Sequence, residues 1–450
     1  MSTFTREDSQ RLTSVGPDSE MGALMRRYWI PVCLSEELPT VHCDPIPVTV
    51  LGEKLVAFRG ADGAVGLLDR YCPHRRADLV LARNEDCALR CVYHGWKMDA
   101  KGAVLEAPPE PPSGKFAQSV ENIAYPTRES GNMVWAYLGP ADQQPPFPNY
   151  PFDELPQGHV QTFKIRQPRN WVRSLDGELD AGHAGYLHFT KEEWERQRNS
   201  HFDGYKYLFD PTPSTAVTEK PYGLEFMFRY GLEEPDRSAF WVRNFLPPIF
   251  AISGQPVGAR GLFIAYVPAH DRETNVYFLW WREDAPISEE QMAEIDLSLQ
   301  VRCADPDRDY VSSFFTEEEG YVQDREAMTA NESYSGFEGV LVQDLAVQYS
   351  MDDEVNFERE NLGAEDMVVI RARRYLLGLL DDFAQGKELP CLQPDMDYRD
   401  VEFRWVVAPS DTPFTDIAAH PEWAVSPGPM PEGWKPAQSP WIPIGQPDEC

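Results

Sequence analysis

Long apolar runs are absent from this sequence of 450 residues. The longest, such as Phe263–Pro268 and Tyr375–Leu380, fall far short of the ~20 residues that a helix needs to cross a bilayer. The first segment, Met1–Arg11, is polar and charged and has no apolar stretch of the signal-peptide type. We therefore expect a cytoplasmic protein without a membrane-spanning segment.

Basic residues are scarce relative to acidic ones. The chain has 41 Lys and Arg residues against 73 Asp and Glu residues, so its formal net charge is −32. A field of that sign repels phosphate, and neither nucleic acid nor an anionic membrane surface is expected as a partner. An anionic small molecule would need Arg or Lys side chains at its own site, because charges beyond about 8 Å are screened at physiological salt.

Cysteine is also sparse, since eight residues in 450 are too few for a disulfide scaffold. No G-x-G-x-x-G segment follows a predicted strand, so no nicotinamide or flavin site is expected in this chain. Three cysteines and two histidines nevertheless fall within Cys72–His94, and such clusters indicate a metal site. Apart from Cys72 and Cys91, we interpret the cysteines as ordinary free thiols: Cys33, Cys43, Cys87, Cys303, Cys391 and Cys450.

The hydropathy pattern predicts an α+β protein in two parts. Apolar residues alternate from Pro47 to Asp69, so residues 1–145 are predicted to form a lead-in and a small antiparallel β domain. The Pro-rich residues 144–156 mark a boundary, and residues 146–450 form the second domain. There we predict strands at 159–166, 224–231, 237–244 and 260–283, helices at 176–190, 289–301, 338–350 and 364–385, and an irregular Pro-rich tail at 404–447.

The first group of candidate ligands consists of two short Cys/His motifs. Cys72-Pro-His74 is followed, after sixteen residues, by Cys91-Val-Tyr-His94. Two thiolates and two imidazoles could bind one zinc ion, or a two-iron, two-sulfide cluster with the cysteines on one iron and the histidines on the other. Zinc modules separate paired ligands by two to four residues, so a C-x-H pair favours ligands directed at two different metal ions.

These motifs resemble a known family. Residues Tyr71–Gly102 are similar to the Rieske domain of the ring-hydroxylating oxygenases, and Arg26–Pro31 and Leu55–Arg59 are similar to its phthalate dioxygenase branch. The resemblance implies a Rieske cluster held by Cys72, His74, Cys91 and His94. One departure is Arg76, where many members have a small residue such as Gly.

A second group of candidate ligands lies in the other domain, around Asp180, His183 and His188. Two imidazoles and one carboxylate form the facial triad of non-haem Fe(II) oxygenases, which leaves positions open for O₂ and substrate. His183 and His188 are five residues apart and would diverge by roughly 140° on an ideal helix. A shared metal therefore requires the helix to bend, end or widen near Gly185.

Asn170–His188 matches the D-x-x-H-x₄-H motif of the same family. The match implies that His183 and His188 bind the mononuclear iron, and that Asp180 links this site by hydrogen bonds to the cluster of a neighbouring subunit. The segment Gln343-Asp344 resembles the Q-D segment that supplies the carboxylate, so we expect Asp344 to be the third ligand.

The resemblance implies a Rieske domain joined to a helix-grip catalytic domain, in a homotrimer or hexamer. It implies a terminal oxygenase that uses O₂ and receives electrons from an NADH-dependent reductase, directly or through a ferredoxin. We expect an aromatic carboxylic acid, of phthalate or lignin-derived type, as substrate. Ring dihydroxylation, monohydroxylation and O-demethylation all remain open, because they share the same metal ligands.

Two other functions remain as alternatives: a Rieske electron-transfer protein without oxygenase activity, and a zinc-stabilised binding module. Arg243 could clamp a substrate carboxylate, but we favour an exposed strand residue. Trp96, Tyr71 and Tyr93 flank the Cys/His motifs, and we expect them to serve core packing rather than electron transfer.

Overall fold

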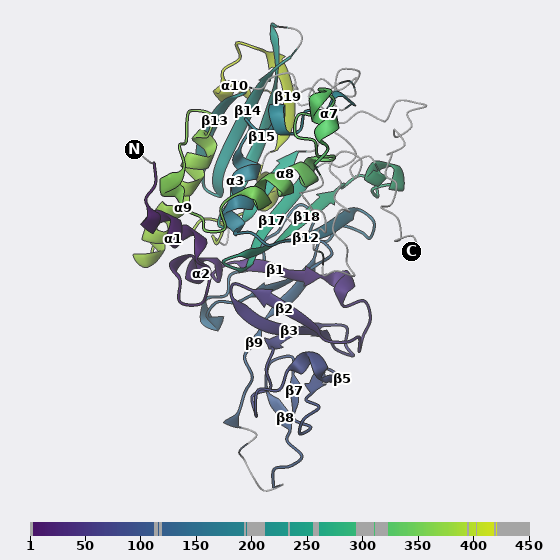
Figure 1. The fold of residues 1–450 in the computed structure, drawn as a ribbon. Coiled ribbons are helices and arrows are strands. Elements are labelled where there is room, and N and C mark those ends of the chain that lie inside the picture. The colour runs from purple at the N-terminus through teal and green to yellow at the C-terminus, as the bar shows by residue number, and fades with distance from the viewer. Residues whose placement is uncertain are drawn as a thin grey trace.

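The computed structural model describes residues 3–111, 116, 119–192, 195, 212–232, 235–254, 261–293, 310, 323–393, 396–401, 403–417 and 420. These residues form an α+β protein with small antiparallel sheets at one end and one large antiparallel sheet flanked by helices at the other (Figure 1). Within them, no helix has the length and apolar character that crossing a membrane requires. Cys303, Cys450 and most of the helix predicted at 289–301 lie outside this part of the chain.

The small end consists of two four-stranded antiparallel sheets around a core of their own. Phe58, Leu89, Trp96 and Met98 are among its buried residues, together with Cys72 and Cys91. Hairpins form where Gly52 and Gly63 adopt positive φ, as the turn residues predict. The sheet orders are β2(Ile46–Val50)-β3(Glu53–Arg59)-β4(Val65–Asp69)-β9(Ala124–Tyr125) and β5(Arg83–Glu85)-β6(Ala88–Arg90)-β7(Lys97–Asp99)-β8(Val104–Glu106).

A three-stranded sheet joins this end to the larger one, and its strands are β1(Trp29–Leu34), β11(Met133–Tyr137) and β10(Thr127–Ser130). Every residue of β1 and β11 is buried, because both faces of these strands are covered. Two short helices, α1(Arg6–Thr13) and α2(Glu20–Met25), precede the sheet and lie beside the large end in Figure 1.

The large sheet has eight antiparallel strands. Its order is β12(Val160–Gln167)-β18(Glu273–Trp281)-β17(Gly261–His270)-β16(Phe250–Gly254)-β15(Arg237–Leu246)-β14(Gly223–Gly231)-β13(Ser214–Lys220). The eighth strand, β19(Arg404–Pro409), pairs with the first half of β15, whereas β16 pairs with its second half.

Two sequence predictions for this sheet were wrong. The segment 260–283 is a hairpin of two strands rather than one, because Asp271 and Arg272 form a polar turn between two runs that are both buried. Residues 404–409 are not irregular: Trp405, Val406 and Ala408 are buried, and the strand is stabilised by pairing with β15, far away in the sequence.

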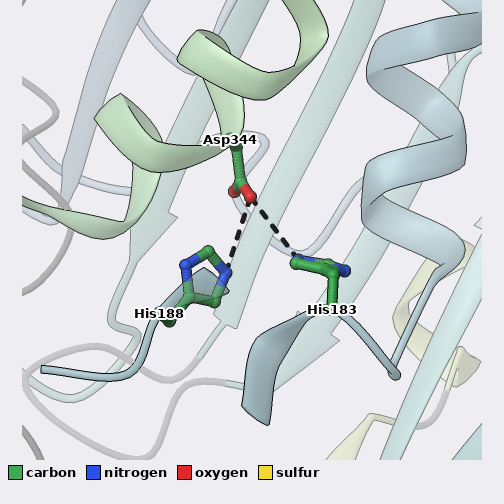
Figure 2. Close-up of side chains that lie close together, drawn as sticks. All are labelled: His183, His188 and Asp344. Carbon is green, nitrogen blue, oxygen red and sulfur yellow. Dashed lines mark ion pairs between the residues drawn. The ribbon is translucent and has the colours of Figure 1, made fainter. Parts of the chain in front are cut away.

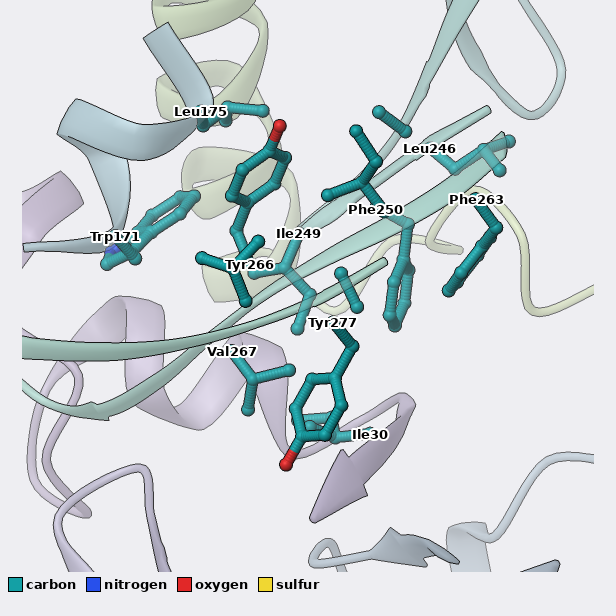
Figure 3. Close-up of a cluster of buried hydrophobic side chains, with 14 of the residues drawn as sticks. Ile30, Trp171, Leu175, Leu246, Ile249, Phe250, Phe263, Tyr266, Val267 and Tyr277 are labelled. Atoms are coloured by element: carbon teal, nitrogen blue, oxygen red, sulfur yellow. The ribbon is translucent and has the colours of Figure 1, made fainter. Parts of the chain in front are cut away.

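Helices cover one face of the large sheet (Figure 1). Figure 3 shows Trp171 and Leu175 of α3(Trp171–Leu179) beside Tyr266, while Phe263 and Tyr277 lie on the other side with Ile30 of β1. The two longest helices match the predicted ones closely. They are α8(Val340–Ser350) and α9(Met367–Ala384), and shorter helices occur at α4(Ala184–Leu187), α7(Arg325–Thr329) and α10(Phe414–Ile417).

Candidate metal centres

The two Cys/His motifs form two loops with the same backbone hydrogen bonds. The Cys72 amide donates to the carbonyl of Ala77, and Arg76 donates back to Cys72; Cys91 and Trp96 repeat the first bond, and Gly95 donates back to Cys91. The residue four positions after each cysteine has positive φ, at 60° for Arg76 and 74° for Gly95. Each loop thus turns tightly enough to bring its cysteine and histidine to one end.

Within these loops the predicted cluster ligands lie in two pairs, the two histidines and the two cysteines. The rings of His74 and His94 lie 4.6 Å apart between centroids, and Cys72 and Cys91 are buried. Nδ1 of His94 is buried and has no hydrogen-bond partner among the described residues. A buried, unsatisfied imidazole nitrogen is costly unless a ligand takes it, so this donor set fits a metal cluster.

The electrostatics of the loops agree with this fit. Burial and the neighbouring His74 and Arg75 lower the pKa of His94, which keeps the ring neutral and able to bind a metal. Burial raises the pKa of Cys72 to about 11, so its thiol keeps a proton until a metal ion displaces it.

The aromatic residues around the loops behave differently from one another. Trp96 is buried and stacks on His74, with ring centroids 4.7 Å apart and an interplanar angle of 2°. Tyr93, in contrast, is 55% exposed, so the prediction of core packing was wrong for this residue. The reason is that it stands at the loop tip, where Arg75 lies over its ring. Tyr71 is partly buried, beneath Arg76.

His183, His188 and Asp344 form the second centre. Oδ1 of Asp344 lies 3.5 Å from Nε2 of each histidine (Figure 2). The three candidate ligand atoms all lie within 4.8 Å of one another, which is close enough to surround one metal ion. Asp344 reaches the histidines from α8, more than 150 residues later in the chain.

The histidines meet because the predicted helix at 176–190 ends early. Helix α3 stops at Leu179, Asp180 adopts an extended conformation, and only one further turn, α4, follows. His183 precedes α4 and His188 follows it, so both rings face Asp344 from either end of a single turn. A helix could bend, end or widen to bring two residues that are five apart to one metal, and in this chain the helix ends.

Hydrogen bonds orient both histidines through Nδ1. Oδ2 of Asp180 lies 3.1 Å from Nδ1 of His183, and Oε1 of Gln343 lies 2.8 Å from Nδ1 of His188. If each Nδ1 carries a proton, each Nε2 is left with a lone pair for a metal. Gln343 is a functional candidate that was not predicted from the sequence, where only the resemblance of the Gln343-Asp344 segment pointed to it.

Charge accumulates around His183. Burial opposes its protonation, yet the hydrogen bonds of Asp180 and Asp344 outweigh burial and raise the pKa of His183 to about 10. Burial alone would raise the pKa of Asp180, but the hydrogen bond from His183 lowers it overall. A site this rich in negative charge attracts a cation, and a metal ion competes directly with the proton on His183.

Arg243 is not the exposed strand residue that we favoured. It is only 7% exposed, because its guanidinium lies 4.0 Å above the ring of Trp241 and pairs with Glu178 of α3. The helix that covers the sheet therefore buries it, which the strand pattern alone could not predict.

Comparison with known proteins identifies the family of both parts of the chain. Residues 28–124 match the Rieske 2Fe-2S domain, and residues 136–428 match the family described as LigXa C-terminal domain like. The chain is 35% identical to the phthalate 4,5-dioxygenase oxygenase subunit of Pseudomonas putida, over 94% of this chain and 99% of that one. It belongs to the phthalate dioxygenase-like Rieske oxygenases.

The oxygenase has further relatives with other substrates in their names. It is 32% identical to the 3-chlorobenzoate-3,4-dioxygenase oxygenase subunit of Comamonas testosteroni, over 88% of this chain and 93% of that one. The fold matches the QL mutant of Pseudomonas putida CBB5 NdmA with caffeine, with a TM-score of 0.54, 20% identity, and coverage of 88% of this chain and 99% of that one. It also matches dicamba monooxygenase, with a TM-score of 0.53, 18% identity, and coverage of 80% and 98%.

These findings establish a terminal Rieske oxygenase subunit of the ring-hydroxylating or demethylating systems, which works with a reductase or ferredoxin component. They exclude the two alternatives, a Rieske protein limited to electron transfer and a zinc-stabilised binding module. The Rieske cluster and the helix-bearing catalytic fold are confirmed. The division of the chain at residues 145 and 146 stays a prediction.

Proposed function

We propose that this subunit uses O₂, and electrons from an NADH-dependent reductase, to hydroxylate an aromatic carboxylic acid. The single observation that carries the proposal is the convergence of His183, His188 and Asp344 within 4.8 Å. We assign these three side chains as ligands of a mononuclear Fe(II), and Cys72, His74, Cys91 and His94 as ligands of the Rieske cluster. When bound, the two centres supply oxygen activation and single electrons.

The protein's own residues prepare the iron site for this role. Asp180 and Gln343 orient the two rings through Nδ1, and Asp344 lies 3.5 Å from both Nε2 atoms. Bound to one iron as a facial set, these three ligands would leave its other side open for reactants. Substrate held in fixed orientation over this open side determines which carbon is oxidised.

Asp180 is the residue we propose as the link between centres of neighbouring protomers. One carboxylate oxygen accepts from the Gly182 amide at 2.7 Å, and the other bonds His183. The side chain is still 28% exposed, so an edge of the carboxylate is accessible to the histidine of another subunit. This arrangement supports a homotrimer or hexamer in which electrons cross from chain to chain.

The substrate class rests on the relatives, whose names include phthalate, 3-chlorobenzoate and, for a 38% identical relative over 41% of this chain, 5,5'-dehydrodivanillate. The reactions we consider are dihydroxylation, monohydroxylation and O-demethylation of a methoxylated aromatic acid. We propose that they take place in the cytoplasm. A screen of aromatic acids for NADH and O₂ uptake with a surrogate reductase, followed by product mass, distinguishes them.

Metal analysis tests the proposed ligands separately from the substrate. The intact protein should contain three irons and two inorganic sulfides per chain, which is roughly the content of one cluster plus one mononuclear site. His183→Ala and Asp344→Ala should each lose the third iron and substrate oxidation while retaining the paramagnetic signal of the reduced cluster. Normal iron content with full turnover in either variant would move the site elsewhere.

A further inference from the structure

Glu178 and Arg243 form a buried ion pair beside the iron site. Their side chains are 10% and 8% exposed, and Glu178 comes from α3, two residues before Asp180. The guanidinium also lies over the ring of Trp241, which itself stacks on Trp405 with centroids 4.6 Å apart. The pair is therefore part of the surface that the sheet presents to α3, not a mobile surface contact.

Two polar atoms at or beside this ion pair are buried and unsatisfied. Nε of Arg243 and Oγ of Ser253 are buried without a hydrogen-bond partner in the described part of the chain. The two residues are cross-strand partners in β15 and β16, so their side chains lie on the same face of the sheet. Two neighbouring donors left unsatisfied in a native interior indicate a missing acceptor, such as a bound molecule.

The unsatisfied donors lie within the electrostatic reach of the iron site. The negative charge of Asp344 favours a higher pKa for Arg243 and for Tyr266, which is also buried on this face of the sheet. Tyr266 points toward Leu175 of α3 in Figure 3, so this face of the sheet lies opposite the helix that leads to His183. A molecule bound to Arg243 and Ser253 would thus lie on the face of the sheet that α3 covers, the helix that leads to the proposed iron site.

We propose that Glu178 determines substrate specificity: it neutralises Arg243, so that the substrate presents an uncharged oxygen to the Arg243 and Ser253 donors. A hydroxyl, methoxyl or carbonyl group fits this description. The inference rests on the proposed function and narrows its substrate class, because the carboxylate of an aromatic acid then lies away from this end of the site.

Charge balance is the physical reason why this position favours an uncharged oxygen over a carboxylate. A guanidinium that already pairs with Glu178 gains little from a second carboxylate, which would enter the interior without a partner cation. Displacing Glu178 instead would leave that residue buried and unpaired, at a comparable cost. A neutral oxygen accepts hydrogen bonds from both donors and meets neither penalty.

Binding of two probes to the intact, cluster-loaded oxygenase tests the proposal. The probes are 3-methoxybenzoate and isophthalate, which share one carboxylate and differ in the charge of the second substituent. We expect calorimetry to show that the natural protein binds 3-methoxybenzoate roughly tenfold or more tightly than isophthalate. Glu178→Gln should shift this ratio toward isophthalate by at least about tenfold, because Arg243 then lacks a counter-charge.

Glu225→Gln is the matched control. Glu225 is also a buried carboxylate of this sheet, paired with Lys220 at 3.2 Å, but its cross-strand partner is Asn244, on the face opposite Arg243. The ratio of affinities should stay as in the natural protein. The double variant Glu178→Gln/Arg243→Gln, which leaves no unpaired charge, should also keep the preference for 3-methoxybenzoate, and it replaces the single variant if that one does not fold.

The outcomes separate the two proposals. Equal ratios in the natural protein and in Glu178→Gln, or a natural preference for isophthalate, overturn the role of Glu178 and leave the proposed function standing. Isophthalate preference in the double variant would show that Glu178 acts through its size, which also overturns the charge argument. Failure of both probes to bind any variant overturns the substrate class itself, and the inference with it.

Discussion

At the scale of a residue, the buried amide of Gln343 determines which ring nitrogen of His188 carries a proton. Its Oε1 bonds Nδ1 of His188 at 2.8 Å, and its Nε2 donates to the Phe337 carbonyl at 2.9 Å. Because the second bond can only be made by the NH₂ group, the oxygen must face the histidine, and His188 must carry its proton on Nδ1. The lone pair of Nε2 is then directed toward Asp344.

We therefore predict that Gln343→Leu weakens iron binding by about 10–100-fold, the range typical of residues that orient a metal ligand. Chelator competition on the purified subunit measures this loss, and the cluster signal should be unchanged. Gln348→Leu is the control: it alters a buried glutamine on the same helix that has no bond to either histidine among the described contacts. Equal loss in both variants would indicate general damage to α8.

Arg76 shows that one sequence departure has a backbone cost. It occupies the positive-φ position that Gly95 occupies in the other loop, with an Asp69 ion pair at 2.7 Å holding its side chain. A left-handed conformation costs a non-glycine residue roughly 1–2 kcal/mol.

Exchanging these residues tests the equivalence of the two loops. Gly95→Ala should lower the free energy of unfolding by about 1 kcal/mol through φ alone, since a Cβ there comes no closer than 3.4 Å to Pro108. Arg76→Gly should change it by less than about 1 kcal/mol, because relief of the backbone offsets the lost ion pair. Denaturant titrations of the cluster-loaded protein compare the two, and a larger loss in Arg76→Gly would contradict the account.

At the scale of elements, the position of α3 decides the geometry of the proposed iron site. The helix ends just before Asp180, and ion pairs hold its buried side against α9. Arg373 of α9 is 3% exposed and bonds Asp176 of α3 and also Glu360, which in turn pairs with Arg173. Such a network holds the helix in a defined position only while every charge keeps its partner.

We predict that Arg373→Met destabilises the protein by about 3–5 kcal/mol, because it leaves Asp176 buried and unpaired. The double variant Arg373→Met/Asp176→Leu should recover most of this loss in denaturant titrations. Iron content should fall in the single variant and return in the double one, since α3 then regains its packing. A double variant as unstable as the single one would show that the pair itself, not the unpaired charge, is required.

At the scale of the whole molecule, the two candidate centres lie in different parts of the fold. The Cys/His loops belong to the small sheets, and the His183 site lies against the large one (Figure 1). A part-buried ion pair between Lys164 of β12 and Glu37, at 2.7 Å, joins the large sheet to the segment that follows β1. Electron delivery through a neighbouring protomer is therefore the arrangement we propose.

Co-expression of two inactive chains tests this arrangement. One chain carries His74→Ala and lacks a functional cluster, and the other carries His183→Ala and lacks the iron. In a ring where electrons pass between neighbours, a 1:1 mixture should regain about a quarter of the activity. Adding Asp180→Asn to the iron-competent chain should abolish the recovery with both metals bound. No recovery in the mixture would confine transfer to single chains.

The sequence by itself determined which residues could bind metals, because ligand chemistry depends on residue type and on short spacings such as Cys72 to His74. It also located the long helices α8 and α9, whose apolar periodicity is a local property. Only the tertiary structure decided what those residues meet. The early end of α3, the pairing of β19 with β15, and the burial of Arg243 by Glu178 all depend on contacts between segments distant in sequence, which local patterns do not encode.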